Sequence, residues 1–327
     1  MAVQQLNGEP AVNAAWATQA PAEMASRPLV WSFKFPDDAQ TILRAWAVIL
    51  SVAAIDWICA GRAGFTISGI FPLASKIMML AAVGFIFDHT GRARWVSDAA
   101  HYLALWISLA VAIEIYSYSV ATLRLPMWDQ QFARMDAALR FNWVAGFNLI
   151  APHRMLRFVL VHSYNSILLQ VLASIGYFAA IGRSDRNREL LWIGMLSALI
   201  TASLSAVVPA VGPYVKVLPP WSAVLVALRD GSLTRFAVGE MTGIVAFPSF
   251  HTAMAVFLVY VHRPPLRSFT PIALLNAVML VAIPFAGHHY LVDMIAGAMI
   301  AAGSIAVVRH LSNRSSAISV FPEQTIA

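Results

Sequence analysis

The sequence predicts an all-α polytopic transmembrane helical bundle with about eight spans. Apolar residues make up 59% of the 327 residues and charged residues only 12%, whereas a soluble domain is usually about half apolar and about a quarter charged. Runs of about 20 mostly apolar residues, the length that a helix needs to cross the hydrocarbon, recur along the chain. Basic residues gather between these runs, as is typical of membrane proteins.

Eight apolar runs are expected to be membrane helices. They cover residues 41–60, 65–87, 101–123, 156–181, 190–211, 246–261, 271–286 and 289–309. The membrane domain is therefore expected over residues 41–310, between disordered cytoplasmic tails over residues 1–40 and 311–327. The first tail has no apolar core of the kind found in a secretory signal. The single Cys59 lies within the first run and predicts neither a disulfide framework nor a cysteine-based metal site.

The basic residues predict the orientation of the bundle. With eight spans both termini lie on one side, and placing them in the cytoplasm puts three short basic loops there, as the positive-inside rule requires. These loops carry Arg92, Arg94, Arg183, Arg186, Arg188, Arg263 and Arg267. The net charge of +6 is thus explained by membrane topology, and no nucleic-acid partner is expected.

The first long outer segment, residues 124–155, contains an amphipathic stretch. Its apolar residues recur at spacings of three and four: Phe132, Met135, Leu139 and Trp143. Asp136 and Arg140 are expected to form an i,i+4 pair elsewhere on the same helix. Such a helix is expected to lie in the membrane interface, where it either anchors the protein or shapes a substrate entrance.

A first candidate site opens the sixth run, at Phe-Pro-Ser-Phe-His-Thr over residues 247–252. Pro248 suits the first turn of a helix and Ser249 suits its cap, so the string alone can be read as a helix start. A helix N-terminus also offers free backbone N–H groups and a positive dipole end, which favour a phosphate. His251 beside these groups favours a site, and this string alone leaves both readings open.

A second candidate site, Gly-His-His-Tyr-Leu-Val-Asp over residues 287–293, leads into the eighth run. His289 and Asp293 are four residues apart and are expected to share one helix face. A carboxylate beside one imidazole nitrogen fixes the tautomer and leaves the other nitrogen free to attack. The pair could instead only tie helices together, but an ionisable pair inside a membrane is costly enough to favour a function.

Topology brings the two strings to one level of the membrane, because a single helical hairpin links them. Two histidines that face one phosphoryl group can divide the work: one attacks phosphorus and the other protonates the departing oxygen. The residues alone do not assign these roles. His153, His162, Tyr164 and Asn165 lie near the outer end of the fourth run, and an interhelical hydrogen bond is the simplest role for His162.

Pro-Ser-x-His followed about forty residues later by His-x-x-x-Asp resembles the type 2 phosphatidic acid phosphatase superfamily. The fuller strings resemble most its inositol phosphorylceramide synthase-like, or inositolphosphotransferase, branch. The resemblance covers about residues 206–309, the expected catalytic core, and includes Val-Pro-Ala-Val-Gly-Pro over residues 208–213. It implies that His289 forms a phosphohistidine from a lipid phosphate, that Asp293 orients it and that His251 is the general acid. It also implies that no metal or other cofactor is needed.

Two features of the superfamily are absent, which leaves the phosphate-binding cations open. The usual lysine with Arg-Pro seven residues later is missing, since Lys216 has Ala223 at that offset, and Ala282 and Ile283 replace a serine-arginine pair. The synthase-like branch commonly lacks both features. Outer-face candidates are Arg124, Arg134, Arg140, Arg154, Arg157, Lys216, Arg229 and Arg235.

Lys216 and Arg235 flank the motif region and are the cations predicted to bind substrate, together with Ser249. His288 is a further candidate for substrate binding, or it fills a position where glycine is common in such turns.

The sequence therefore predicts an integral inner (plasma) membrane enzyme that transfers phosphoesters, with its active site on the periplasmic, extracytoplasmic face. The acceptor is water, inositol, a sugar or a lipid hydroxyl, and the residues do not distinguish among these. The alternative is a transporter or channel in which the His–Asp pair relays protons, although the sequence shows neither the broken helices nor the repeat symmetry typical of transporters. The oligomeric state is not predicted.

Overall fold

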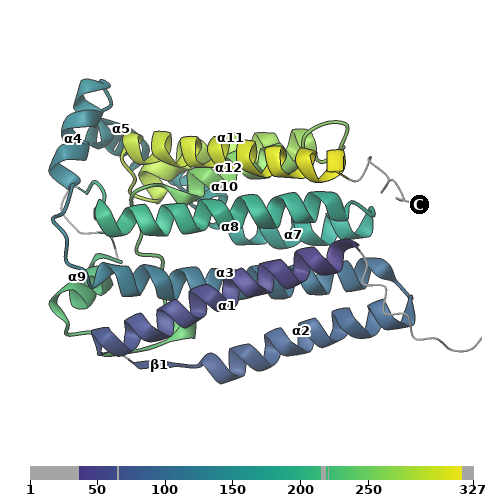
Figure 1. The fold of residues 1–327 in the computed structure, drawn as a ribbon. Helices are drawn as coiled ribbons and strands as arrows, with labels where there is room; N and C mark the ends of the chain where they lie inside the picture. The colour runs from purple at the N-terminus through teal and green to yellow at the C-terminus, as the bar shows by residue number, and fades with distance from the viewer. Residues whose placement is uncertain (1–36, 65, 215–218, 220, 319–327) are drawn as a thin grey trace, which may run out of the picture.

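The computed structural model describes residues 37–64, 66–214, 219 and 221–318, and in this part of the chain almost all regular structure is helical (Figure 1). Six of the described helices are long and apolar enough to cross a membrane, and one bent pair of helices raises this number to seven. The predicted all-α polytopic bundle is confirmed. The long helices number six to seven where about eight spans were expected.

The elements follow one another along the chain as shown in Figure 1. The long helices are α1 (Asp37–Ala63), α2 (Ile70–Thr90), α3 (Arg94–Ala121), α8 (Ser184–Val207), α11 (Phe269–Ala286) and α12 (Leu291–Ile318). The shorter helices are α4 (Asp129–Ala138), α5 (Trp143–Ile150), α6 (Arg154–Asn165), α7 (Ile167–Ala180), α9 (Ser222–Asp230), α10 (Phe250–Val261) and the 3-10 turn η1 (Val238–Glu240). Strands β1 (Thr66–Ser68) and β2 (Arg235–Ala237) pair in parallel, with Thr66 opposite Arg235.

Every apolar run of the sequence forms helix over most of its length, but several limits differ from those predicted. The fourth run is divided into α6 and α7 at Ser166, and the second begins with β1 before Gly69 turns the chain into α2. Helix α10 has only 12 residues, and α12 continues to Ile318, into the predicted C-terminal tail. Residues 1–36 and 319–327 of the predicted tails lie outside the described residues.

The helices pack in layers, with α10, α11 and α12 on one side, α7 and α8 next to them, and then α3, α1 and α2 (Figure 1). The largest buried cluster draws side chains such as Leu105, Leu190 and Phe257 from these layers. Because lipid supplies little hydrophobic drive between helices, close packing must hold them together. Gly194 of α8 shows this: a Cβ there would lie 2.4 Å from the ring of Trp106 on α3.

The two ends of the bundle differ in composition. The short turns that carry Arg92, Arg183 and Arg263 lie at one end, where α1 also begins (Figure 1). The starts of α10 and α12 lie at the opposite end, together with α4, α5 and α9. Both histidine strings are therefore at the same end of the bundle, away from the basic turns.

The amphipathic stretch is not one continuous helix, which corrects two sequence predictions. Helix α4 stops at Ala138, and the chain turns through Arg140, whose φ is 58°, before α5 begins. As a result Phe132 and Trp143 are buried while Met135 and Leu139 are exposed, so the four do not form one face. The predicted Asp136–Arg140 pair was also wrong, because the carboxylate of Asp136 accepts hydrogen bonds from the start of α12.

Candidate functional site

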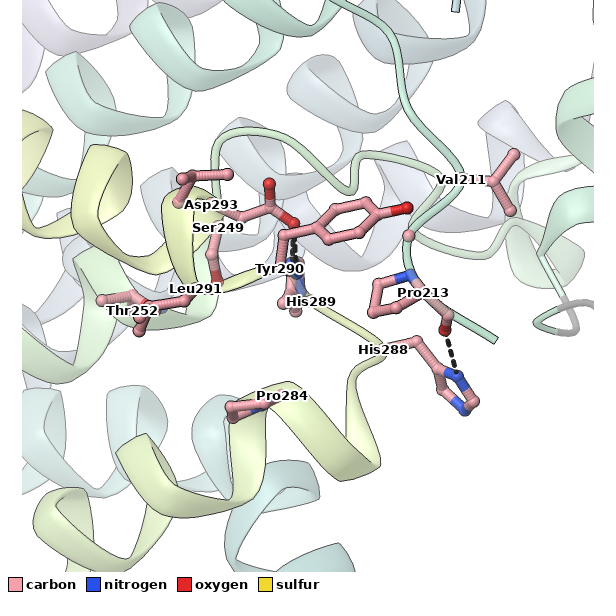
Figure 2. Close-up of polar contacts among 12 residues, drawn as sticks. Val211, Pro213, Ser249, Thr252, Pro284, His288, His289, Tyr290, Leu291 and Asp293 are labelled. Carbon is pink, nitrogen blue, oxygen red and sulfur yellow. Dashed lines mark hydrogen bonds and ion pairs between the residues drawn. The ribbon is translucent and has the colours of Figure 1, made fainter. Parts of the chain in front are cut away.

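His289 and Asp293 meet at the start of α12. The helix begins at Leu291, so His289 precedes it instead of lying on its first turn. The two atoms His289 Nδ1 and Asp293 Oδ2 are nevertheless 3.4 Å apart, an ion-pair distance (Figure 2). Both side chains are buried. Asp293 Oδ2 also accepts the Tyr290 N–H at 2.8 Å. Within the described residues, Asp293 Oδ1 and His289 Nδ1 make no hydrogen bond.

The start of α10 lies directly on this pair. Ser249 caps α10, since its hydroxyl oxygen accepts the Thr252 N–H at 3.3 Å. The Ser249 N–H donates to the backbone carbonyl of Asp293 at 3.0 Å. Gly297 on α12 allows this approach, because a Cβ at that position would lie 2.2 Å from the Ser249 carbonyl oxygen. The structure thus joins the two strings through backbone contacts that the sequence did not reveal.

The open end of α10 offers donors for an anion. In the described part of the chain, the backbone N–H groups of Phe250 and His251 have no hydrogen-bond partner. The first N–H groups of a helix have no acceptor within the helix, and they point along a dipole whose positive end favours negative charge. An oxyanion such as a phosphate group matches this arrangement.

Tyr164 of α6 connects the two histidines, a role that was not assigned from the sequence. Its ring stacks on His251, with the centroids 4.0 Å apart and the planes inclined by 12°. Gly287 lies between this tyrosine and His289: a Cβ there would be 2.6 Å from Tyr164 Cε2 and 2.9 Å from His289 Cδ2. No local pattern around Tyr164 could have indicated contacts with residues so distant in the sequence.

His288 is oriented differently from its neighbour. Its backbone has a φ of 53°, its Nδ1 donates to the Pro213 carbonyl at 3.1 Å, and its ring points away from the His289–Asp293 pair (Figure 2). The ring centroid is 5.7 Å from that of Trp143 and 5.7 Å from that of Trp221. Burial lowers the pKa of His288 and the Pro213 contact acts in the opposite direction. A role for His288 in substrate binding stays a prediction.

Of the two cations singled out from the sequence, the structure describes only Arg235. Lys216 lies outside the described residues, and Arg235 is an exposed residue of β2, next to the α1–α2 connection. A third candidate, Arg140, lines a cleft of about 540 Å³ together with Asn142 and Tyr290, the residue that follows His289. Among the described residues, no group of three or more His, Cys, Asp or Glu side chains is arranged to hold a metal ion.

Comparison with known proteins gives the family. A family model described as the PAP2 superfamily matches residues 130–307, more than half of the chain and all of both histidine strings. The chain belongs to the PAP2 superfamily. Neither a search of curated proteins nor a search of solved structures found a match.

Membership in the PAP2 superfamily indicates an enzyme of the phosphatase or phosphotransferase type that acts on a lipid phosphate. The long apolar helices agree with an integral membrane protein. The PAP2 match starts at residue 130, near the beginning of α4. It therefore includes α6 and all of α4 except Asp129. Both helices supply contacts to the turn around His289, although they precede residues 206–309, the core expected from the sequence.

Proposed function

We propose that this PAP2 superfamily member transfers the phosphoryl group of a lipid phosphoester through a phosphohistidine on His289. The observation that carries the proposal is the buried His289–Asp293 pair, with Nδ1 and Oδ2 3.4 Å apart, set against the open N-terminus of α10. Asp293 would hold the proton on Nδ1 and leave Nε2 as the nucleophile. The unpaired N–H groups of α10 are suited to the charge that develops on the phosphoryl oxygens.

The first half of the reaction forms a P–N bond and breaks a P–O ester bond. The lone pair of His289 Nε2 attacks phosphorus, and the electrons of the broken bond leave with the alcohol oxygen. His251, which must be protonated when the lipid phosphate is bound, gives that oxygen a proton and becomes neutral. In the second half an acceptor hydroxyl attacks phosphorus, its proton passes to His251, and the electrons of the P–N bond return to Nε2. Each group then regains its starting state.

The acceptor that we propose is an alcohol, such as an inositol or a sugar. Two observations support transfer over hydrolysis. The strings over residues 247–252 and 287–293 resemble the inositol phosphorylceramide synthase-like branch. The cleft beside Tyr290 also offers polar groups, from Arg140, Asn142 and Tyr214, to a hydroxylated molecule. We further propose that the site faces the extracytoplasmic side, because the basic turns lie at the other end of the bundle.

The test uses the full chain, purified in detergent, with a panel of lipid phosphates in the presence and absence of inositol or sugar acceptors. Mass spectrometry should detect a phosphorylated alcohol and a dephosphorylated lipid, and vanadate should inhibit the reaction. Free phosphate formed at the same rate with and without acceptors would instead identify a lipid phosphatase. No turnover on any lipid phosphate, combined with proton transport in vesicles that vanadate does not affect, would favour the relay alternative.

Replacement of His289 separates the nucleophile from other histidines. His289→Ala should abolish turnover and the phosphorylated protein, because it removes the proposed nucleophile. His162→Ala is the matched control, since His162 is on α6 and its ring contacts the carbonyl and the ring of Phe158 in its own helix. Retained turnover in His289→Ala would exclude the phosphohistidine mechanism.

A further inference from the structure

Helix α4 faces the turn around His289 with two carboxylates and one aromatic ring. Asp129 is its first residue and Asp136 is seven residues later, close to two turns of helix, so both lie on one face. Phe132 lies between them on that face and is only 3% exposed. Its ring centroid is 4.5 Å from that of Phe247 and 5.9 Å from that of Tyr290. This face of α4 therefore packs on segments from both histidine strings.

Asp136 caps α12 from outside the helix. One carboxylate oxygen accepts the Leu291 N–H at 2.8 Å, and the other accepts the Val292 N–H at 3.1 Å. These are the first two residues of α12, whose N–H groups have no acceptor in their own helix. Asp136 is 4% exposed, so little water is at hand to replace it. Burial raises the pKa of Asp136, and the two N–H groups, which favour its charged form, act in the opposite direction.

Asp129 holds a second segment against the same turn. Its carboxylate accepts the Val211 N–H at 3.0 Å and the Gly212 N–H at 2.9 Å, and the Tyr290 hydroxyl lies 3.4 Å away (Figure 2 shows Val211 and Tyr290). Gly212 has a φ of 97°, and a Cβ there would lie 2.1 Å from the His288 carbonyl oxygen. By binding the N–H groups of residues 211 and 212, Asp129 thus holds in place the backbone segment that packs against His288.

His289 lies between these two attachments, and in the described part of the chain the one ion pair of its ring is with Asp293, at 3.4 Å. The place of the ring is therefore determined largely by the backbone on either side of it. Displacement of a reacting group by about 1 Å is enough to cost a large part of a catalysed rate. A helix that holds the turn on both sides of His289 therefore controls the position of the His289 ring relative to the substrate phosphorus.

We propose that Asp129 and Asp136 are positioning residues, which hold the turn at His288–Val292 so that His289 is aligned for attack on phosphorus. The proposal rests on the proposed role of His289 as the nucleophile. It assigns to α4 a part in the reaction itself, beyond anchoring the protein at the membrane. A carboxylate that only stabilised the start of α12 would affect unfolding and leave the turnover of folded protein unchanged.

The central variant is Asp136→Asn, which keeps the shape of the side chain but offers one acceptor oxygen to two N–H groups. We expect kcat for phosphatidic acid in mixed micelles to fall about tenfold or more, with KM within about twofold, because one buried donor is left without a partner. Hydrogen–deuterium exchange of the peptide over residues 287–294 should become faster. Asp129→Asn should act in the same direction, and Asp136→Glu, which keeps both oxygens, should restore part of kcat.

Two variants serve as controls. Met135→Ala changes an exposed residue on the same helix, and Asp230→Asn changes an exposed carboxylate at the end of α9, whose acceptor contact is with the N–H of Ser232. Both should keep the exchange rate and kcat of the wild type. These two controls separate the loss of the hydrogen bonds to Asp129 and Asp136 from two other effects. One is a general loosening of α4, and the other is a general loss of negative charge at this end of the bundle.

The outcomes distinguish this proposal from the proposed function. Faster exchange in Asp136→Asn with an unchanged kcat would show that Asp136 is only a helix cap. This result would overturn its positioning role and leave the proposed function intact. An unchanged hydrogen–deuterium exchange rate in Asp136→Asn would show that Asp136 does not hold the turn, and would overturn the whole inference. A wild type without turnover on any lipid phosphoester would overturn the proposed function and this inference with it. If Asp136→Asn does not fold, the kcat and exchange of Asp129→Asn and Asp136→Glu decide between the same outcomes.

Discussion

At the scale of single residues, Asp293 joins three parts of the site. Its Oδ2 faces His289 and accepts the Tyr290 N–H, while its backbone carbonyl accepts the Ser249 N–H from the start of α10. The side chain is fully buried. A buried carboxylate is costly unless its charge has a partner, and here the partner is the imidazole that is proposed to react. The chemistry and the packing of the site therefore depend on the same residue.

Replacing Asp293 with asparagine tests the orientation of the imidazole. Asp293→Asn preserves the shape of the side chain but offers no negative charge to His289, and its amide can favour the wrong tautomer. We expect kcat to fall by about 10³ to 10⁴, with lipid binding nearly unchanged, by comparison with the same change in a serine protease triad. Steady-state kinetics and a lipid-binding measurement check this. Equal losses in both would indicate a purely structural pair.

Tyr164 tests whether the stacked ring matters to His251. Tyr164→Phe keeps the ring and should retain kcat within about twofold, whereas Tyr164→Leu loses the stacking and should lower kcat about three- to tenfold, since such ring pairs contribute about 0.5–1.5 kcal/mol. The measurement is kcat on one lipid phosphate at saturation. A Tyr164→Phe variant as impaired as Tyr164→Leu would assign the effect to the hydroxyl instead of the ring.

At the scale of elements, the site depends on how closely α10 and α12 approach each other. Gly297 is the point of contact, where a Cβ would meet the Ser249 carbonyl at 2.2 Å. The obstacle is backbone, which cannot rotate away as the end of a flexible side chain can. The same helix carries Gly303, where an added Cβ would meet no described heavy atom within 4 Å apart from its own helix backbone and chain neighbours. The two glycines thus form a natural test and control.

Gly297→Ala should force α10 and α12 apart and disturb both histidine strings. We expect it to destabilise the protein by about 1–3 kcal/mol, as overpacking usually does, and to lower kcat in the fraction that remains folded. Gly303→Ala should leave both quantities near those of the wild type. Thermal unfolding in detergent together with kcat provides the comparison. A Gly297→Ala protein with normal stability and turnover would mean that this contact is not needed.

Local patterns predicted the elements, and contacts between distant residues decided the rest. Hydropathy located the long helices because each is a separate apolar run, long enough to cross a membrane. It did not show the turn at Arg140, and it could not show the hydrogen bond between Asp136 and Leu291, which are 155 residues apart. The same holds for the site. His289 and Asp293 were found by their spacing of four, whereas Tyr164 and Asp129 reach their partners only through the tertiary fold.

At the scale of the whole molecule, the two ends of the bundle carry different residues. The basic turns, the start of α1 and the end of α12 share one end, and the histidine strings occupy the other (Figure 1). Positive charge near short loops keeps those loops in the cytoplasm. The expected arrangement is therefore cytoplasmic termini and a site that faces the extracytoplasmic side.

Cysteine labelling tests this arrangement, since the chain has one cysteine, Cys59. In a Cys59→Ala background, Ser232→Cys should react with a membrane-impermeant maleimide in intact cells, because Ser232 lies at the end that carries the site. Arg92→Cys, in a basic turn, should react only after permeabilisation. Gel-shift or mass spectrometry of the labelled protein reads out both results. The reverse pattern would invert the orientation, although the helical fold would be unaffected.

The contact at Gly297 also limits which parts of the protein are free to move during turnover. Helices α10 and α12 touch through main-chain atoms and share the bond from Ser249 to Asp293, so they should travel as one rigid body. A lipid tail that approaches the site from the bilayer must then displace an element other than α10 and α12. Helix α6 meets His251 through the faces of two rings, which slide past each other at low cost. Flexibility around the catalytic groups should therefore concentrate on the α6 side.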